Sequence, residues 1–137
     1  MAILPGRTLP ATTDAYTTHL QVLRKRVNYT DRGVAVTIGT IPAGAVVMGG
    51  GVQLVTTFND SGTDLLDIGT SADADEFATA LVVSATAPIY IAVDELATNN
   101  SYSETADITV TATYSGENSN ASAGAADVII WYSIKHT

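Results

Sequence analysis

The sequence consists mainly of short stretches with the alternation of β-strands, separated by clusters of Gly, Pro, Asn and Ser. In the clearest stretch, residues 106–114, Ile108 and Val110 alternate with Thr109 and Thr111. Strict alternation sends one set of side chains to the core and the other toward solvent. We therefore expect the two aliphatic residues to be buried and the two threonines to be more exposed.

Other strands are expected in six stretches that show alternation or a short apolar run, namely residues 20–29, 34–38, 45–58, 65–70, 89–93 and 125–134. Basic and apolar residues are mixed on both faces of 20–29, which indicates an edge strand or a strand between subunits. Residues 125–134 carry large apolar side chains on both faces. They are therefore expected in the centre of a sheet or beneath a partner.

Two polar loops are expected to close hairpins within a sheet. Residues 115–124 would pair the two strands that flank them, and residues 59–62 would do the same for the strands before and after them. The long apolar run between 45 and 58 is interrupted by three consecutive glycines, Gly49–Gly51. Glycines inside a strand indicate a bulge, a bend or a close approach of another backbone.

Residues 72–80 form the one segment in which we expect a helix. Ser71 can cap its N-terminus, and Asp73, Asp75 and Glu76 crowd the first turn, where the helix dipole favours anions. Many short strands and almost no helix predict an all-β fold, an antiparallel β-sandwich of jelly-roll-like architecture. The pattern does not determine the order of the strands.

The length and composition exclude several classes of protein. A chain of 137 residues is expected to form one domain, or one domain with an arm. The net charge of −8 argues against binding bare nucleic acid, which needs clustered Lys and Arg. The absence of cysteine excludes disulfides and thiol catalysis. No apolar run approaches the roughly 18 residues that span a membrane, and no signal-peptide pattern is visible. We expect neither nucleic acid nor a membrane as a partner.

The charge is divided unevenly along the chain. Residues 1–32 carry a net charge of +3 and residues 33–137 a net charge of −11. The first segment holds five of the six basic residues: Arg7, Arg24, Lys25, Arg26 and Arg32. Pro5 and Pro10 favour extended backbone before them. We therefore divide the chain into an extended basic N-terminal arm with the first strand, 1–32, and a β-sandwich domain, 33–137. The basic residues form either a solvated strand face or salt-bridged contacts with an acidic neighbouring subunit.

No catalytic constellation is present in the sequence. His19 and His136 lie near the two ends, and neither has a Ser or an acid at motif spacing. The acids between residues 73 and 76 admit a calcium site, but helix capping explains them more simply. We therefore expect no catalytic residue, no metal and no cofactor.

The remaining candidates are expected to be structural. Asp60, Asp64 and Asp67 flank a predicted loop and are expected to be solvated. Trp131 and Tyr132 lie in the last predicted strand. They are expected to be core or interface anchors, in preference to a platform that binds sugar or peptide.

The sequence of residues 33–134 resembles a family of phage proteins. The motifs are I-P-A-G-A-V-V, T-x-F-N-x-S-G and L-x-I-G in residues 33–70, then A-D-I-T-V-T-A-T-Y-S-G, a polar loop and V-I-I-W-Y. They are similar to segments of the capsid decoration proteins of tailed bacteriophages, also called cement or auxiliary head proteins, and of related head-fibre and tail modules.

The resemblance implies a non-enzymatic structural virion protein that binds the outside of a phage capsid and clamps neighbouring capsomers. Its implied partner is the major capsid protein, its location is the capsid exterior, and a homo-oligomer, favoured as a trimer, is expected. The expected interface residues are Arg7, Arg24, Lys25, Arg26, Arg32 and Trp131. The alternatives are a carbohydrate- or receptor-binding sandwich on a head fibre or tail, and a small β-sandwich enzyme.

Overall fold

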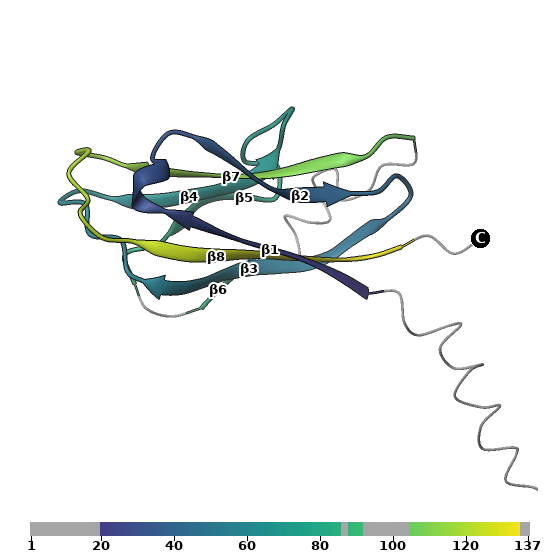
Figure 1. Ribbon diagram of the computed structural model, residues 1–137, viewed down its shortest axis with the longest axis horizontal. Helices are drawn as coiled ribbons and strands as arrows, with labels where there is room; N and C mark the ends of the chain where they lie inside the picture. The colour runs from purple at the N-terminus through teal and green to yellow at the C-terminus, as the bar shows by residue number, and fades with distance from the viewer. Residues whose placement is uncertain (1–19, 86–87, 92–104, 135–137) are drawn as a thin grey trace, which may run out of the picture.

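The computed structural model describes residues 20–85, 88–91 and 105–134, which form two stacked β-sheets (Figure 1). The strands of this described part are β1 (Leu20–Asn28), β2 (Ala35–Ile41), β3 (Val46–Thr56), β4 (Asp64–Thr70), β5 (Ala78–Val82), β6 (Ile89–Tyr90), β7 (Ile108–Gly116) and β8 (Ala125–Ser133), and a 3₁₀ turn, η1 (Tyr29–Asp31), follows β1. Sheet A has the order β1-β8-β3-β6, and sheet B has the order β2-β7-β4-β5. The prediction of an all-β sandwich is confirmed. In these ranges no helix is long and apolar enough to cross a membrane.

The strand pairing explains the jelly-roll arrangement. Strand β1 pairs with β8, β2 with β7, β3 with β6 and β4 with β5, and every pair is antiparallel. The first half of the chain therefore pairs with the second half in reverse order, as in a long hairpin that is wrapped into two sheets. Strand β8 lies between β1 and β3, and β1 lies at a sheet edge, as predicted.

An apolar layer between the two sheets forms the core. Val128 and Ile130 of β8 are fully buried, as are Val110 and Tyr114 of β7, and all four belong to one cluster. The ring of Phe58 packs on Tyr114 with a centroid distance of 4.4 Å. Burial of this layer supplies the main stabilising contribution of the fold.

Both predicted hairpins are wrong, because the loops cross from one sheet to the other. Strands β7 and β8 lie in different sheets, and so do β3 and β4. The connecting loops, residues 57–63 and 117–124, hydrogen-bond to each other. Asn59 Oδ1 accepts the backbone N–H groups of Ser122 and Ala123, each at 2.9 Å. The polar residues that were expected to turn a strand back within its own sheet instead join the two sheets.

The prediction that Asp60 and Asp64 are solvated is also wrong. Asp60 accepts three backbone N–H groups, one from its own loop and two from the loop before β8. Burial opposes ionisation of Asp60, but these hydrogen bonds lower its pKa overall. Asp64 is 1% exposed and accepts the hydroxyl proton of Tyr114 at 2.6 Å. Burial, together with this bond to Asp64, raises the pKa of Tyr114, so the hydroxyl stays a donor.

The predicted helix at 72–80 is wrong, because residues 71–77 form a loop that leads into β5. The Thr70 hydroxyl accepts two backbone N–H groups of this loop, as short polar side chains do when they compete with helix formation. The N–H of Phe77 then donates to the carbonyl of Ile68 at 2.9 Å, which starts the pairing of β5 with β4. Phe77 is fully buried there, so the three acids of the loop cap no helix.

The alternation in β7 is only partly as predicted. Val110 is fully buried, as expected, but Ile108 is only half-buried. Thr111, which was expected to be more exposed, is 5% exposed. The reason is the loop after β4, which folds over β7. The N–H of Ser71 donates to the carbonyl of Thr109 at 3.2 Å, and the Thr111 hydroxyl donates to a carbonyl at the end of β4.

Gly69 is the position of β4 over which this loop closes. A Cβ atom there would collide with the carbonyl oxygen of Asp73 and with the backbone of Ala74. Because backbone atoms must move, Gly69→Ala is expected to reduce the free energy of unfolding by about 1–3 kcal/mol, as overpacking does. Urea denaturation measures this loss. As a control, Ser115→Ala on the exposed face of β7 should stay within about 0.5 kcal/mol of wild type. Equal stability of Gly69→Ala and wild type would contradict the closed loop.

Candidate interaction surface

The register of the strands sets four rows of residues across the outer face of sheet A. Since Val128 and Ile130 point into the core, the residues between them on β8 point outward. From one end to the other, the rows are Leu20–Ser133–Val46, Val22–Trp131–Gly49, Arg24–Ile129–Gly51–Tyr90 and Arg26–Asp127–Gln53. The apolar side chains lie in the first three rows, and the last row is polar and charged.

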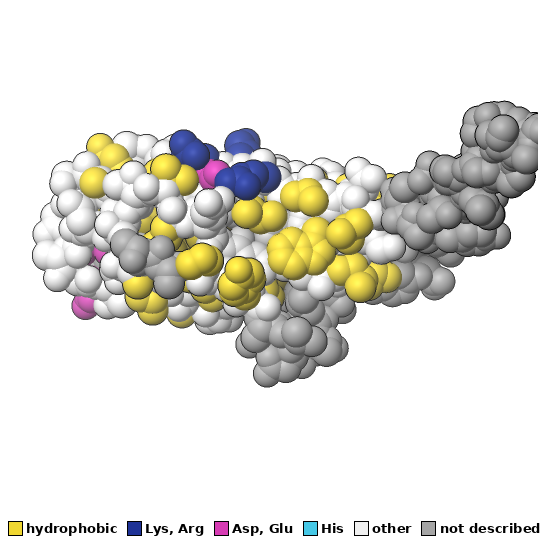
Figure 2. Space-filling view, turned by 90° about the horizontal axis from the view of Figure 1, so that it is seen from below, with side chains coloured by type: hydrophobic (Ala, Val, Ile, Leu, Met, Phe, Trp, Pro, Cys, Tyr) yellow, Lys and Arg dark blue, Asp and Glu magenta, His cyan; other side chains and the backbone are white. Residues whose placement is uncertain are grey.

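The apolar residues of these rows form a continuous surface, here called the apolar patch: Leu20, Val22, Val46, Tyr90, Ile129 and Trp131. Figure 2 shows hydrophobic side chains gathered on this face beside a group of basic side chains. Val22 is 58% exposed and Tyr90 is 73% exposed. Exposed apolar side chains that gather on one face, with polar and charged residues beside them, mark interaction sites in soluble proteins. The patch therefore has the character of an interaction surface.

Two of the three glycines of β3, Gly49 and Gly51, lie on the outer face and make the patch flat, whereas Gly50 faces the core side chains of Ile91 and Ile130. A Cβ atom at Gly49 would lie 2.5 Å from Cζ2 of Trp131, so the indole lies directly on the backbone of β3. A Cβ atom at Gly51 would collide with the carbonyl oxygen of Ile89. The register also shifts between Val47 and Gly49. The glycines thus mark both a bulge and a close approach, as predicted.

A groove of about 250 Å³ lies within the patch, beside β6. Its apolar walls include Pro88, Ile89, Tyr90, Ile129 and Trp131, and its polar side chain is that of Gln53. Two aromatic rings and a proline around a shallow groove suit an apolar, extended ligand better than a charged one.

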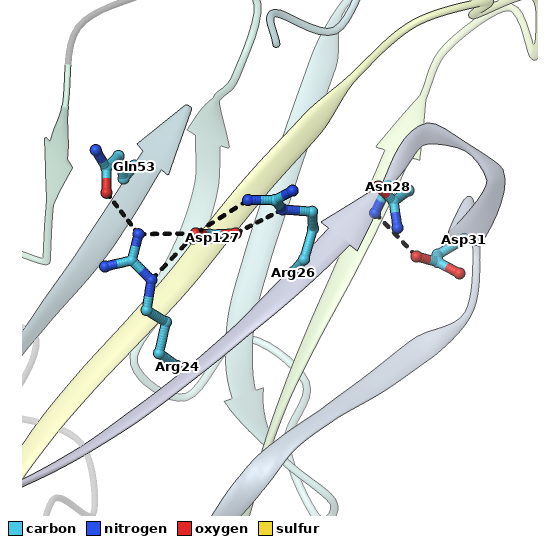
Figure 3. Close-up of polar contacts among 6 residues, drawn as sticks. All are labelled: Arg24, Arg26, Asn28, Asp31, Gln53 and Asp127. Carbon is cyan, nitrogen blue, oxygen red and sulfur yellow. Dashed lines mark hydrogen bonds and ion pairs between the residues drawn. The ribbon is translucent and has the colours of Figure 1, made fainter. Parts of the chain in front are cut away.

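An ion cluster around Asp127 joins the three strands β1, β8 and β3 at the other end of the face (Figure 3). Arg24 donates from Nη2 and Nε to Asp127 Oδ2, at 2.7 and 3.1 Å. Arg26 Nε donates to Asp127 Oδ1 at 2.8 Å, and Arg24 Nη2 also reaches Gln53 Oε1 at 2.7 Å. The carboxylate lies between the two guanidinium groups, so the cluster keeps an excess positive charge.

The cluster holds the carboxyl of Asp127 in its ionised form. The side-chain hydrogen bond from Arg26 is the largest cause that lowers the pKa of Asp127. Burial acts in the opposite direction, and the hydrogen bond from Arg24 and the two positive charges outweigh it. Asp127 therefore stabilises the fold as an anion, in spite of being 6% exposed.

The structure places four of the predicted interface residues near one another. Arg24, Arg26 and Trp131 share the outer face of sheet A. Lys25 lies between the two arginines in sequence and is paired with the inward residue Val128, yet its side chain is exposed at the sheet edge. The basic run is therefore split between two sides of β1. It does not form a single patch.

The other sequence candidates lie elsewhere. Arg32 follows η1, and its Nε donates to the carbonyl of Gly116 at 2.8 Å, so this side chain joins the turn to the end of β7. Arg7, His19 and His136 lie outside the described residues. Within the described part of the chain, no cluster of three or more His, Asp or Glu side chains is arranged to hold a metal ion.

Sequence reasoning missed seven members of this surface: Leu20, Val22, Val46, Gln53, Tyr90, Asp127 and Ile129. One signal for Asp127 was available, since it is a single acid inside a strand that was expected to be central and apolar. A buried acid in such a strand requires a cationic partner. The basic residues of β1 were the obvious source.

Asp127→Asn removes the negative charge that the two arginines share. The half-exposed arginines can turn to water, so we expect the free energy of unfolding at neutral pH to fall by only about 1–2 kcal/mol. A carboxyl whose pKa is lowered by folding stabilises the protein above its unfolded pKa of about 4, and this contribution is lost as the pH falls further. Urea denaturation across this range should therefore show wild type and variant converging in acid. A difference in stability that stays constant with pH would contradict the ion cluster.

Comparisons with known proteins relate this fold to phage capsids. No protein-family model and no curated protein matches the sequence. Among known structures, a chain of the capsid asymmetric unit of cyanophage Pam1 is similar with a TM-score of 0.66 and 16% identity, over 85% of each chain. A chain of the acidic stable capsid of Helicobacter pylori bacteriophage KHP30 is similar with a TM-score of 0.64 and 16% identity, over 85% of this chain and 88% of the other. At this identity the similarity is one of fold, and the chain has a β-sandwich fold that also occurs in phage capsids.

Proposed function

We propose that this protein is a structural virion protein that binds the outside of a phage capsid and stabilises it by clamping neighbouring capsomers. The main support is the similarity of its fold, over 85% of its length, to chains of two phage capsids. The resemblance of residues 33–134 to decoration proteins supports the same role. In this proposal the partner is the major capsid protein, and the protein acts as a homo-oligomer, favoured as a trimer.

The surface chemistry of sheet A is compatible with this role. Only 15% of the residues are charged, and an apolar patch is exposed in a single copy. The arginines of the ion cluster on the outer face, and Lys25 on the opposite side of β1, place positive charge along both sides of this edge strand, here called the positive border. We propose that this border contacts acidic groups of the capsid, with Arg7 and Arg32 as further contacts. Exposed charge pairs of this kind affect the rate and specificity of association more than its strength.

The groove beside Trp131 and Tyr90 favours the capsid role over the alternative of a sugar-binding module. Sugar sites combine an aromatic platform with several polar groups that fix the hydroxyl groups of the sugar. The groove offers the side-chain amide of Gln53, whose oxygen already accepts a hydrogen bond from Arg24. The apolar walls suit a hydrophobic segment of protein.

The proposal is tested by adding the purified protein to capsids assembled without it. We expect saturation at a fixed number of copies per capsomer, visible as density on the capsid exterior by cryo-electron microscopy. The decorated capsids should also resist a higher temperature than bare ones, because a ligand that binds only the intact particle stabilises it. Binding with no fixed copy number, or density confined to the tail, would overturn the decoration role.

Lys25→Gln tests whether the positive border of β1 contacts the capsid. Loss of a charge at an exposed contact should weaken attachment by several-fold at low salt, and by less at high salt because ions screen the interaction. The matched control is Ser115→Asp, which changes the net charge by the same amount but lies on β7 of sheet B. Capsid sedimentation measures both affinities. If both variants weakened capsid attachment equally, net charge alone would explain the effect. That result would contradict a contact between β1 and the capsid.

A further inference from the structure

The apolar patch lacks a partner among the described residues, and its shape restricts what can cover it. The middle of the patch is flat, because Trp131 lies on the glycines of β3, and the groove beside Tyr90 is shallow. A surface of this kind accepts an extended segment that lies across it. A helix or a bulky loop needs a deeper groove.

The segment that precedes β1 has the apolar, extended character that the patch and its groove require. It contains two Leu-Pro units, Leu4-Pro5 and Leu9-Pro10, with Ile3 beside the first. A residue before proline favours extended or polyproline backbone, and such segments bind aromatic-lined grooves with little loss of entropy. Proline also lacks the N–H that a strand added to a sheet edge must donate. The segment therefore suits packing on a sheet face.

The spacing of the two units matches the spacing of the rows. In polyproline conformation, the five residue steps from Leu4 to Leu9 span about 15 Å. On β8, the row of Ile129 and the row of Ser133 are four residues apart, which is about 13 Å along a strand. One Leu-Pro unit can thus occupy the groove at Ile129 while the other contacts the row that contains Leu20.

The position of Leu20 directs the segment toward another copy of the chain. Leu20 begins β1 at the same end of the sheet as Ser133 and Val46, so the preceding residues leave the sheet at that end. A return over the same face would need a tight reversal, and residues 11–19 contain neither Gly nor Pro to make one. The nine residues between Pro10 and Leu20 make ten residue steps, which can extend roughly 35 Å, far enough to reach an adjacent molecule.

We propose that residues 3–10 of one copy pack as an extended Leu-Pro segment on the apolar patch of a second copy, over Trp131 and the groove beside Tyr90. Each copy would then place its N-terminal arm on the next copy and bind the arm of another copy on its own patch. Contacts of this type close into a ring, such as a trimer, when the rotation between copies allows it. The proposal concerns copies of this chain alone, so it does not depend on attachment to a capsid.

Cross-linking between two variants tests the contact, since the chain contains no cysteine of its own. A Leu4→Cys chain that carries a size tag is mixed with an untagged Val22→Cys chain and oxidised. We expect a mixed disulfide between the two chains, detected by non-reducing gel and by mass spectrometry. The control partner is Val82→Cys, which is 49% exposed on β5 of sheet B and should give no mixed disulfide above background.

Three outcomes of cross-linking and sedimentation would overturn the proposal. Equal cross-linking to Val22→Cys and Val82→Cys would mean random collision. A disulfide that forms only within one chain, in the double variant Leu4→Cys/Val22→Cys, would place the arm on its own sheet. Sedimentation of the wild-type chain as a monomer at the same concentration would also exclude a second copy as the acceptor.

Trp131 provides an independent signal, because it is the single tryptophan of the chain. Leu4→Ser/Leu9→Ser should shift its emission to the red, increase quenching by acrylamide and reduce the mass of the oligomer. The matched control Ala2→Ser/Ala11→Ser changes the same arm without touching the Leu-Pro units, and should leave all three unchanged. Identical emission and mass in the two double variants would overturn the proposal. Far-ultraviolet circular dichroism shows whether the sandwich stays folded in each.

Discussion

The apolar layer that Val128 and Ile130 of β8 form with Val110 and Tyr114 of β7 joins the two sheets. The position of the outer surface follows from this packing. Because β8 lies between β1 and β3, each inward residue of β8 sends its neighbour to the middle of the outer face of sheet A. Trp131 is central on that face for this reason. A one-residue shift in the register of β8 would turn its core residues outward and its outer-face residues, including Trp131, into the core.

The elements of the fold were largely predictable from the sequence, but their partners were not. Alternation in 106–114 and 125–134 located two central strands, because burial acts on each strand by itself. Pairing depends on residues far apart in the chain, and the assumption of local hairpins failed where loop side chains such as Asn59 bind the other loop. The helix expected at 72–80 failed for a related reason. Burial of Phe77 against β4 stabilises the strand through a contact with another part of the chain. The capping and charge pattern of residues 71–76 carries no information about that contact.

For the candidate surface too, residues with a local pattern could be predicted, and residues that depend on contacts between distant strands could not. The sequence indicated Arg24, Arg26 and Trp131 as interface residues, and the structure brings them to one face. It did not indicate Asp127, which is separated from the two arginines by more than a hundred positions and meets them only through the pairing of β1 with β8.

The glycines of β3 connect the stability of the fold with the use of its outer face. A glycine inside a strand costs about 0.5–1 kcal/mol relative to alanine, because it loses more backbone freedom and packs no side chain. At Gly49 this cost is accompanied by a close approach of the indole of Trp131, which a larger residue would displace. A sheet whose outer face met only water would gain from polar side chains at these positions, as antiparallel sheets commonly have. The sequence instead keeps Gly49 beneath Trp131 and Gly51 beside Tyr90, and the result is a flat apolar surface with the character of an interaction site.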